Sequence, residues 1–143
     1  MNKKECIVCQ RIAPSIVFAT GHKILDGKAS KEKIHEICVE AIECINYADK
    51  KNRIFFCGLS SGTLLGGLFY LLIFKNNMRI TQNEIAAALG KKHYSGGYNI
   101  AFIAAGYKRW YINFPELFES IKDWVRWKTQ NFDWLPWYTK GFS

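Results

Sequence analysis

Cys6 and Cys9 are the residues in this sequence whose type and spacing point most directly to metal chemistry. Two thiolates separated by two residues can bind one side of a tetrahedral zinc ion. His22 is a candidate third ligand, and the fourth is unassigned because no second Cys-x-x-Cys follows. We therefore weigh a zinc cofactor held by Cys6, Cys9 and His22 against free or purely structural thiols.

The number of cysteines also indicates the cellular compartment of the protein. The chain holds five cysteines, an odd number, and its first residues are polar and charged, unlike those of a secretory signal peptide. These features predict a reducing, cytoplasmic environment. Cys38 and Cys44 are then expected to be small buried apolar residues.

Positive charge is the second chemical feature of the chain. The formal net charge is +8, while 49% of the residues are hydrophobic, so a packed core can carry a basic surface. Between Lys75 and Tyr111 there are six cations and one anion, Glu84, a local net charge of +5. Such a surplus favours an anionic partner, either nucleic acid or a membrane surface.

The basic segment contains the residues that we predict to contact duplex DNA. Phosphate contacts are expected from Lys91, Lys92, Lys108 and Arg109, and contacts to base edges from Ser95, Tyr98 and Asn99. The alternative is that the lysines are ordinary solvated residues and the aromatic residues belong to the core.

A helix-turn-helix is the element expected to position these residues. Thr81 and Glu84 have the spacing of a capping box, which predicts a helix that ends at Gly90. A polar link rich in glycine follows, and a second helix is expected over residues 98–111. In a helix-turn-helix the second helix enters the major groove of DNA.

Three further helices are predicted around this pair. Apolar residues recur at helical spacing over residues 30–49. An uncharged run follows at 54–74, in which the loop and cap at 58–62 would leave a core helix over 63–74. A last helix should begin with Asn113 as its cap and Pro115 in its first turn.

The uncharged run also permits a different interpretation. Its 21 residues are long enough to span a bilayer, and its four glycines have the small-residue spacing of packed membrane helices. A small membrane protein that spans the bilayer at 54–74 is therefore one alternative. We favour the shorter core helix over 63–74 instead.

The two ends of the chain differ in composition from the middle. Residues 1–29 combine Cys6 and Cys9 with a β-branched run, which predicts a short β-hairpin or zinc knuckle. At the other end, residues 129–143 form an aromatic tail, and the stretch from Trp124 onward holds four tryptophans. These tryptophans predict a surface for a protein partner, an anchor at a membrane interface, or a tail folded over the core.

The middle of the chain, residues 30–128, resembles a cyclin-like repeat of the transcription factor B family. The resemblance lies in the helix that contains Lys33 to Cys38, the small-residue helix after Gly58, and the stretch from Arg79 to Gly90. It implies a mainly α fold of five helices, in which the third and fourth form a helix-turn-helix. Members of that family contact promoter DNA, TATA-binding protein and RNA polymerase, and usually carry two repeats, whereas this chain has room for one.

These patterns together predict a DNA-binding or transcription-associated accessory protein that uses a helix-turn-helix and a basic loop. Duplex DNA is the expected partner, with a protein of the transcription machinery as a second. A protein-interaction module that does not bind DNA is the main alternative. We expect no enzyme, because the sequence shows no Ser-His-Asp arrangement, no paired carboxylates and no phosphate-binding glycine loop.

Overall fold

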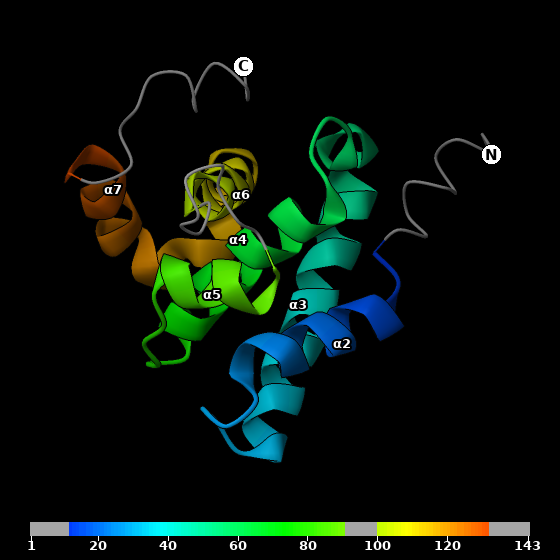
Figure 1. The fold of residues 1–143 in the computed structure, drawn as a ribbon. Coiled ribbons are helices and arrows are strands. Elements are labelled where there is room, and N and C mark those ends of the chain that lie inside the picture. The colour runs from blue at the N-terminus through cyan, green and yellow to red at the C-terminus, as the bar shows by residue number, and fades with distance from the viewer. Residues whose placement is uncertain (1–11, 91–99, 132–143) are drawn as a thin grey trace.

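The protein is mainly helical. A computed structural model describes residues 12–90 and 100–131, and within these ranges it contains six α-helices, two 3-10 segments and no strand (Figure 1). The elements are α2 (Pro14–Leu25), α3 (Lys31–Lys51), η1 (Arg53–Phe56), α4 (Ser61–Lys75), α5 (Gln82–Ala88), α6 (Ile100–Asn113), η2 (Pro115–Ile121) and α7 (Lys122–Asn131).

Helix α4 is the centre of the fold. It begins after Ser60, whose hydroxyl accepts from the Thr63 amide at 3.2 Å, and every residue from Thr63 to Ile73 is buried. The predicted core helix is therefore confirmed. The preceding residues belong to η1 and to a loop in which Gly58 has φ +90°, so the uncharged run is divided as expected. None of the helices in the described ranges is long and apolar enough to cross a membrane.

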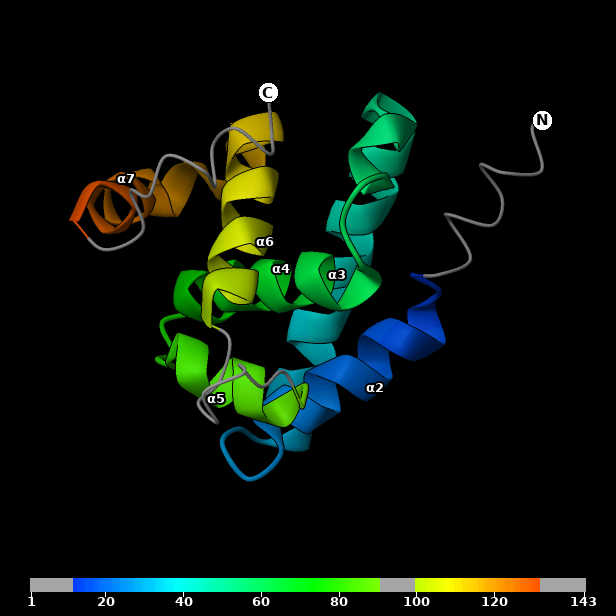
Figure 2. The same cartoon turned by 45° about the horizontal axis from the view of Figure 1, so that its top comes forward.

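Helix α6 crosses α4 at a close approach (Figure 2). A Cβ atom at Gly67 would overlap the backbone of Gly106 and Tyr107, and a Cβ atom at Gly106 would overlap the carbonyl oxygen of Thr63. Only residues without a side chain let the two backbones come this near. The crossing thus depends on one glycine from each helix.

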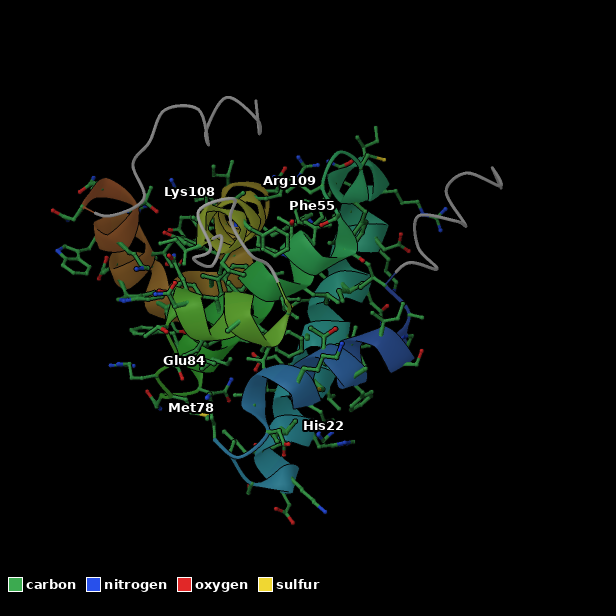
Figure 3. The ribbon with its side chains drawn as sticks, viewed as in Figure 1. His22, Phe55, Met78, Glu84, Lys108 and Arg109 are labelled. Carbon is green, nitrogen blue, oxygen red and sulfur yellow. The ribbon has the colours of Figure 1, made fainter. Side chains whose placement is uncertain are left out.

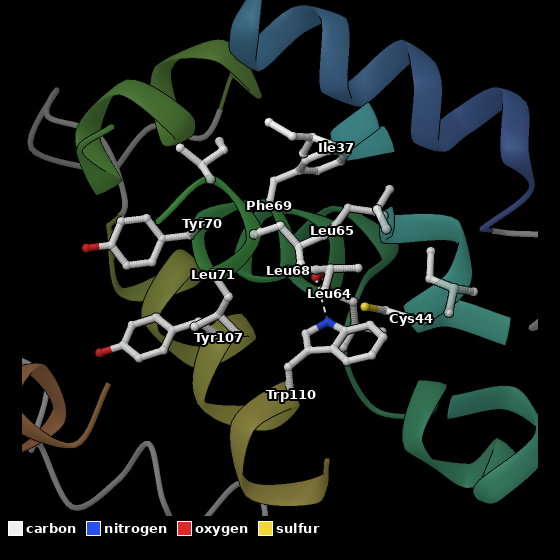
Figure 4. Close-up of a cluster of buried hydrophobic side chains, with 14 of the residues drawn as sticks. Ile37, Cys44, Leu64, Leu65, Leu68, Phe69, Tyr70, Leu71, Tyr107 and Trp110 are labelled. Atoms are coloured by element: carbon white, nitrogen blue, oxygen red, sulfur yellow. Dashed lines mark hydrogen bonds between the residues drawn. The ribbon is translucent and has the colours of Figure 1, made fainter. Parts of the chain in front are cut away.

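Trp110 of α6 anchors the aromatic part of the core (Figure 4). Its indole Nε1 donates to the carbonyl oxygen of Leu64 at 2.9 Å, and the whole residue is buried. Phe55 of η1 meets Trp110 edge to face at 4.6 Å between ring centroids, and Phe114 meets Phe55 at 4.8 Å. These contacts tie η1, α4 and α6 into one cluster.

The predicted hairpin at the N-terminal end is wrong for the described residues, because 14–25 form helix α2. Pro14 occupies its first turn, and Val17, Gly21, Ile24 and Leu25 are buried against α3 and α4. The β-branched run misled the prediction because burial of this face outweighs a weak strand propensity. Although 1–29 was expected to stand apart, α2 shares the hydrophobic core with the other helices.

The capping boundaries of the middle helices are confirmed. Ser30 caps α3, and at α5 the Thr81 hydroxyl accepts from the Glu84 amide while Glu84 Oε1 accepts from the Thr81 amide, both at 3.0 Å. Gly90 follows α5 with φ +68°, a left-handed conformation that favours glycine.

The last predicted helix differs from expectation. Asn113 does not cap it but ends α6, where its Nδ2 donates to the Arg109 carbonyl at 2.8 Å. Pro115 opens the 3-10 segment η2, and the backbone of Phe118 leaves helical geometry at φ −125°, ψ 27°. The buried Phe118 side chain holds this kink in the core, and α7 begins after η2.

Replacing Thr81 with alanine is expected to destabilise the fold by about 1 kcal/mol, because the cap of α5 is lost. The wild type should also lose stability in acid. The backbone amide of Thr81, and then Lys28 at 3.1 Å, hold the pKa of Glu84 below its ordinary value. This stabilisation is complete above the unfolded-state pKa of Glu84 and is lost as pH falls through the lower folded-state pKa.

Urea denaturation of wild type, Thr81→Ala and Glu84→Ala over a pH series measures the effect. The difference between wild type and Glu84→Ala should shrink toward acid pH, whereas Thr81→Ala keeps the backbone amide that bonds to the Glu84 carboxylate. If the difference in the free energy of unfolding stayed constant across the pH series, the Glu84 carboxylate of the capping box would contribute nothing to stability.

Candidate functional site

Lys108 was predicted to contact phosphate, and the structure corrects this prediction. The residue is 2% exposed, and together with Val125 and Thr129 of α7 it lines a hollow beside α6. A side chain that is 2% exposed offers almost no surface to a phosphate group of a bound nucleic acid. Lys108 lies four positions after the buried Ala104 and so shares its helix face, which a count of charges does not reveal.

Arg109 has a structural role instead of the predicted phosphate contact (Figure 3). Its Nη2 donates to the carbonyl oxygens of Phe55 at 2.7 Å and Cys57 at 2.6 Å, and its Nε donates to the Phe55 oxygen at 3.2 Å. The guanidinium also lies 5.5 Å from the centre of the Phe55 ring. Arg109 therefore fastens η1 to α6, and burial lowers its pKa below the ordinary value.

The other predicted nucleic-acid contacts lie outside the described residues. These are Lys91, Lys92, Ser95, Tyr98 and Asn99. Within its described part, α6 buries one face against α4 and exposes Ile100, Ile112 and Asn113, none of which is charged. This part of α6 is a packing element rather than a surface for reading bases.

The proposed zinc ligands are not brought together by the described residues. Cys6 and Cys9 lie outside them, and His22 is exposed on α2. Figure 3 shows His22 at the opposite side of the molecule from Lys108 and Arg109. No group of three or more histidine, cysteine or acidic residues that could hold a metal occurs in 12–90 or 100–131.

Cys38 and Cys44 are buried, as predicted. Burial raises the pKa of the Cys38 thiol to about 11 and, together with the neighbouring Glu40, that of Cys44 to about 12. Both groups are protonated thiols at neutral pH, and the thiolate is the form that binds metal or attacks an electrophile. They serve as small core residues.

A groove lies between α4, the start of α5 and α7. It consists of two adjoining hollows of about 180 and 270 Å³ that share Tyr70, Ile80 and Lys128. We call it the aromatic–cation groove. Its remaining lining residues are Phe74, Met78, Arg79, Thr81, Gln82, Asn83, Ile100, Trp124 and Trp127.

Stacked rings form one wall of the aromatic–cation groove. The rings of Phe74 and Trp124 lie parallel within 8°, with centroids 3.7 Å apart, and Tyr70 meets Trp124 at 5.5 Å. Trp127, one turn further along α7, is 53% exposed. The wall is therefore formed by packed rings at its base and presents the aromatic surface of Trp127 to solvent.

Two cations lie along this wall. The Arg79 guanidinium is 4.4 Å from the centre of the Phe74 ring, and Lys128 Nζ is 5.6 Å from that of Tyr70. Attraction between a cation and the face of a ring holds both side chains beside the groove. Among the described residues that line the groove, Arg79 and Lys128 are cations and none is a carboxylate.

The sequence contains part of the signal for this site. Trp124, Trp127 and Lys128 follow the i, i+3 and i+4 spacing of one helix face, and Trp124 belongs to the apolar stripe of the predicted last helix, but the spacing does not show which surface this face meets. Arg79 was counted in the basic surplus without a role. Their meeting depends on the packing of α7 against η2, which spacing alone does not predict.

No protein-family model matches this chain, and neither a curated protein nor a solved structure matches it. The geometry of the described residues is consequently the basis for any functional assignment.

Proposed function

We propose that this protein binds nucleic acid and that Arg79 and Lys128 of the aromatic–cation groove contact its phosphates. The observation that supports this most strongly is the composition of the groove, which combines two cations with exposed aromatic surface and has no carboxylate in its described lining. Cations neutralise phosphates, and aromatic faces accept bases. A groove of this composition suits an anion that also carries flat rings.

The rest of the basic segment supports the same proposal. Ile100 lines the groove, and the chain that enters α6 at this residue carries Lys91 and Lys92, which we retain as proposed phosphate contacts. Ser95, Tyr98 and Asn99 lie on the same stretch of sequence. Lys108 and Arg109 are no longer part of the proposed interface.

We further propose a cyclin-like arrangement for α3 to α7, with α5 and α6 as its helix-turn-helix. Support comes from the central small-residue helix α4, the capping box of α5 and the crossing of α4 by α6. A transcription-associated role in the cytoplasm, and there at the nucleoid, or in the nucleus accords with this arrangement. The described α6 suits packing better than base readout, so the proposed binding depends on phosphates rather than on a DNA sequence.

Replacing Arg79 and Lys128 together with alanine is expected to weaken nucleic-acid binding and to flatten its dependence on salt. Each lost phosphate contact lowers the slope of log affinity against log salt by about 0.7 for a single strand and about 0.9 for a duplex. The double variant should therefore lose about 1.4 to 1.8 from the slope. Fluorescence anisotropy with labelled single-stranded and duplex oligonucleotides over a salt series measures both quantities.

A control of equal charge is Lys31→Ala combined with Lys50→Ala, because both lysines are exposed on α3 and neither lines the groove. The control variant should keep most of the wild-type slope of log affinity against log salt. Lys91→Ala with Lys92→Ala tests the other proposed phosphate contacts and should also reduce the slope. If the wild type bound neither single-stranded nor duplex DNA at low salt, the proposed function would be wrong.

A further inference from the structure

We infer that the aromatic–cation groove takes an unpaired strand of nucleic acid, with one base stacked on Trp127. This inference rests on the proposed function and specifies the form of nucleic acid that the groove binds. It differs from the duplex partner that a helix-turn-helix would imply.

The size of the groove favours a single strand over a duplex. Each of its two hollows has a volume of only 180 to 270 Å³, below the range of pockets that enclose drug-sized ligands. A duplex stacks its bases inside and presents phosphates outside, so its bases cannot enter a hollow of this kind. A base in a single strand can be splayed out and inserted.

The exposed ring of Trp127 supplies the stacking surface. Trp127 is 53% exposed, while Trp124 one turn earlier is held parallel to Phe74 at 3.7 Å. Stacking between a base and an aromatic side chain tolerates any base, because every base has a flat face. A platform of this kind binds single strands without reading their sequence.

Charged and polar groups flank the platform at positions that suit a nucleotide. Arg79 and Lys128 line the same hollow as Trp127 and can neutralise the phosphates on either side of a stacked base. Asn83 is exposed in the second hollow, and its amide offers both a donor and an acceptor to a base edge. The groove thus offers cations for the phosphates, an aromatic ring for the face of a base and an amide for its edge.

The experiment compares a labelled single-stranded oligonucleotide of about 12 nucleotides with a duplex of the same length, using the full chain and fluorescence anisotropy. The wild type should bind the single strand more tightly. Trp127→Ala should weaken single-strand binding at least about fivefold, and Trp127→Phe should retain most of it. Ile54→Ala alters an apolar residue that is 74% exposed on η1, and it should leave the affinity for the single strand unchanged.

The outcomes separate this inference from the proposed function. Equal or tighter binding of the duplex would overturn the single-strand inference and leave nucleic-acid binding intact, whereas binding of neither probe would remove both. An unchanged single-strand affinity in Trp127→Ala would also overturn the inference. Thermal unfolding of the Trp127 variants should match the wild type, since the side chain is half exposed.

Discussion

Replacing Gly67 with alanine is expected to lower the free energy of unfolding by about 3 kcal/mol or more. The added methyl group would overlap the backbone of Gly106 and Tyr107, and a backbone cannot rotate away as a side chain can. Helices α4 and α6 would have to separate, which would also disturb the bond from Trp110 to Leu64. Urea denaturation followed by far-ultraviolet circular dichroism measures the change.

Gly66 provides a matched control in the same helix. A methyl group there would lie 2.8 Å from Ile103 Cδ1, the end of a side chain that can move, and alanine favours a helix over glycine by about 1 kcal/mol. Gly66→Ala should therefore cost much less than Gly67→Ala. Equal costs for the two variants would mean that the glycine crossing does not limit the approach of the helices.

Replacing Trp110 with alanine is expected to cost about 3–5 kcal/mol, the range for removal of a large buried aromatic side chain. The residue is fully buried and contacts Phe55 and Phe114 as well as the Leu64 carbonyl. Its loss would leave a cavity where η1, α4 and α6 meet. Chemical denaturation again provides the measurement.

Trp110→Phe separates packing from hydrogen bonding in this cluster. Phenylalanine keeps an aromatic ring but lacks the N–H group that bonds to Leu64, so we expect a loss nearer 1–3 kcal/mol. If the alanine variant were as stable as the phenylalanine variant, the core would be able to collapse around the missing ring and the predicted cavity would not form.

The middle helices could be predicted because their signals are local. Ser60 and Thr81 each accept a bond from the amide three residues later, and this spacing is visible in the sequence. The apolar periodicity of α3 and the length of the uncharged run led to helices whose ends agree with the structure within a few residues.

Helix α2 could not be predicted because its stability depends on distant residues. Gly21 lets the helix approach Cys38 and Phe69, which lie 17 and 48 positions later in the chain. Ile16 and Val17 taken alone favour a strand. Burial against α3 decides between the two, and no local pattern contains that information.

The candidate site was only partly predictable for a similar reason. The basic surplus was visible, but charge counting could not distinguish Arg79, which lies beside the groove, from Lys108, which is buried. The groove itself joins α4, α5 and α7, so its composition emerges only after these helices pack. Helix spacing showed which residues share a face, but not which faces meet.

The bonds from Arg109 to η1 have a consequence for folding during synthesis. The carbonyl oxygens of Phe55 and Cys57 accept hydrogen bonds from Arg109, which lies 54 and 52 positions later in the chain. At about 5–20 residues per second, several seconds separate translation of these carbonyls from that of the guanidinium. During this interval the apolar helix α4 lacks α6 as its cover, so the nascent chain passes through a stage that is prone to aggregation and suited to chaperone binding.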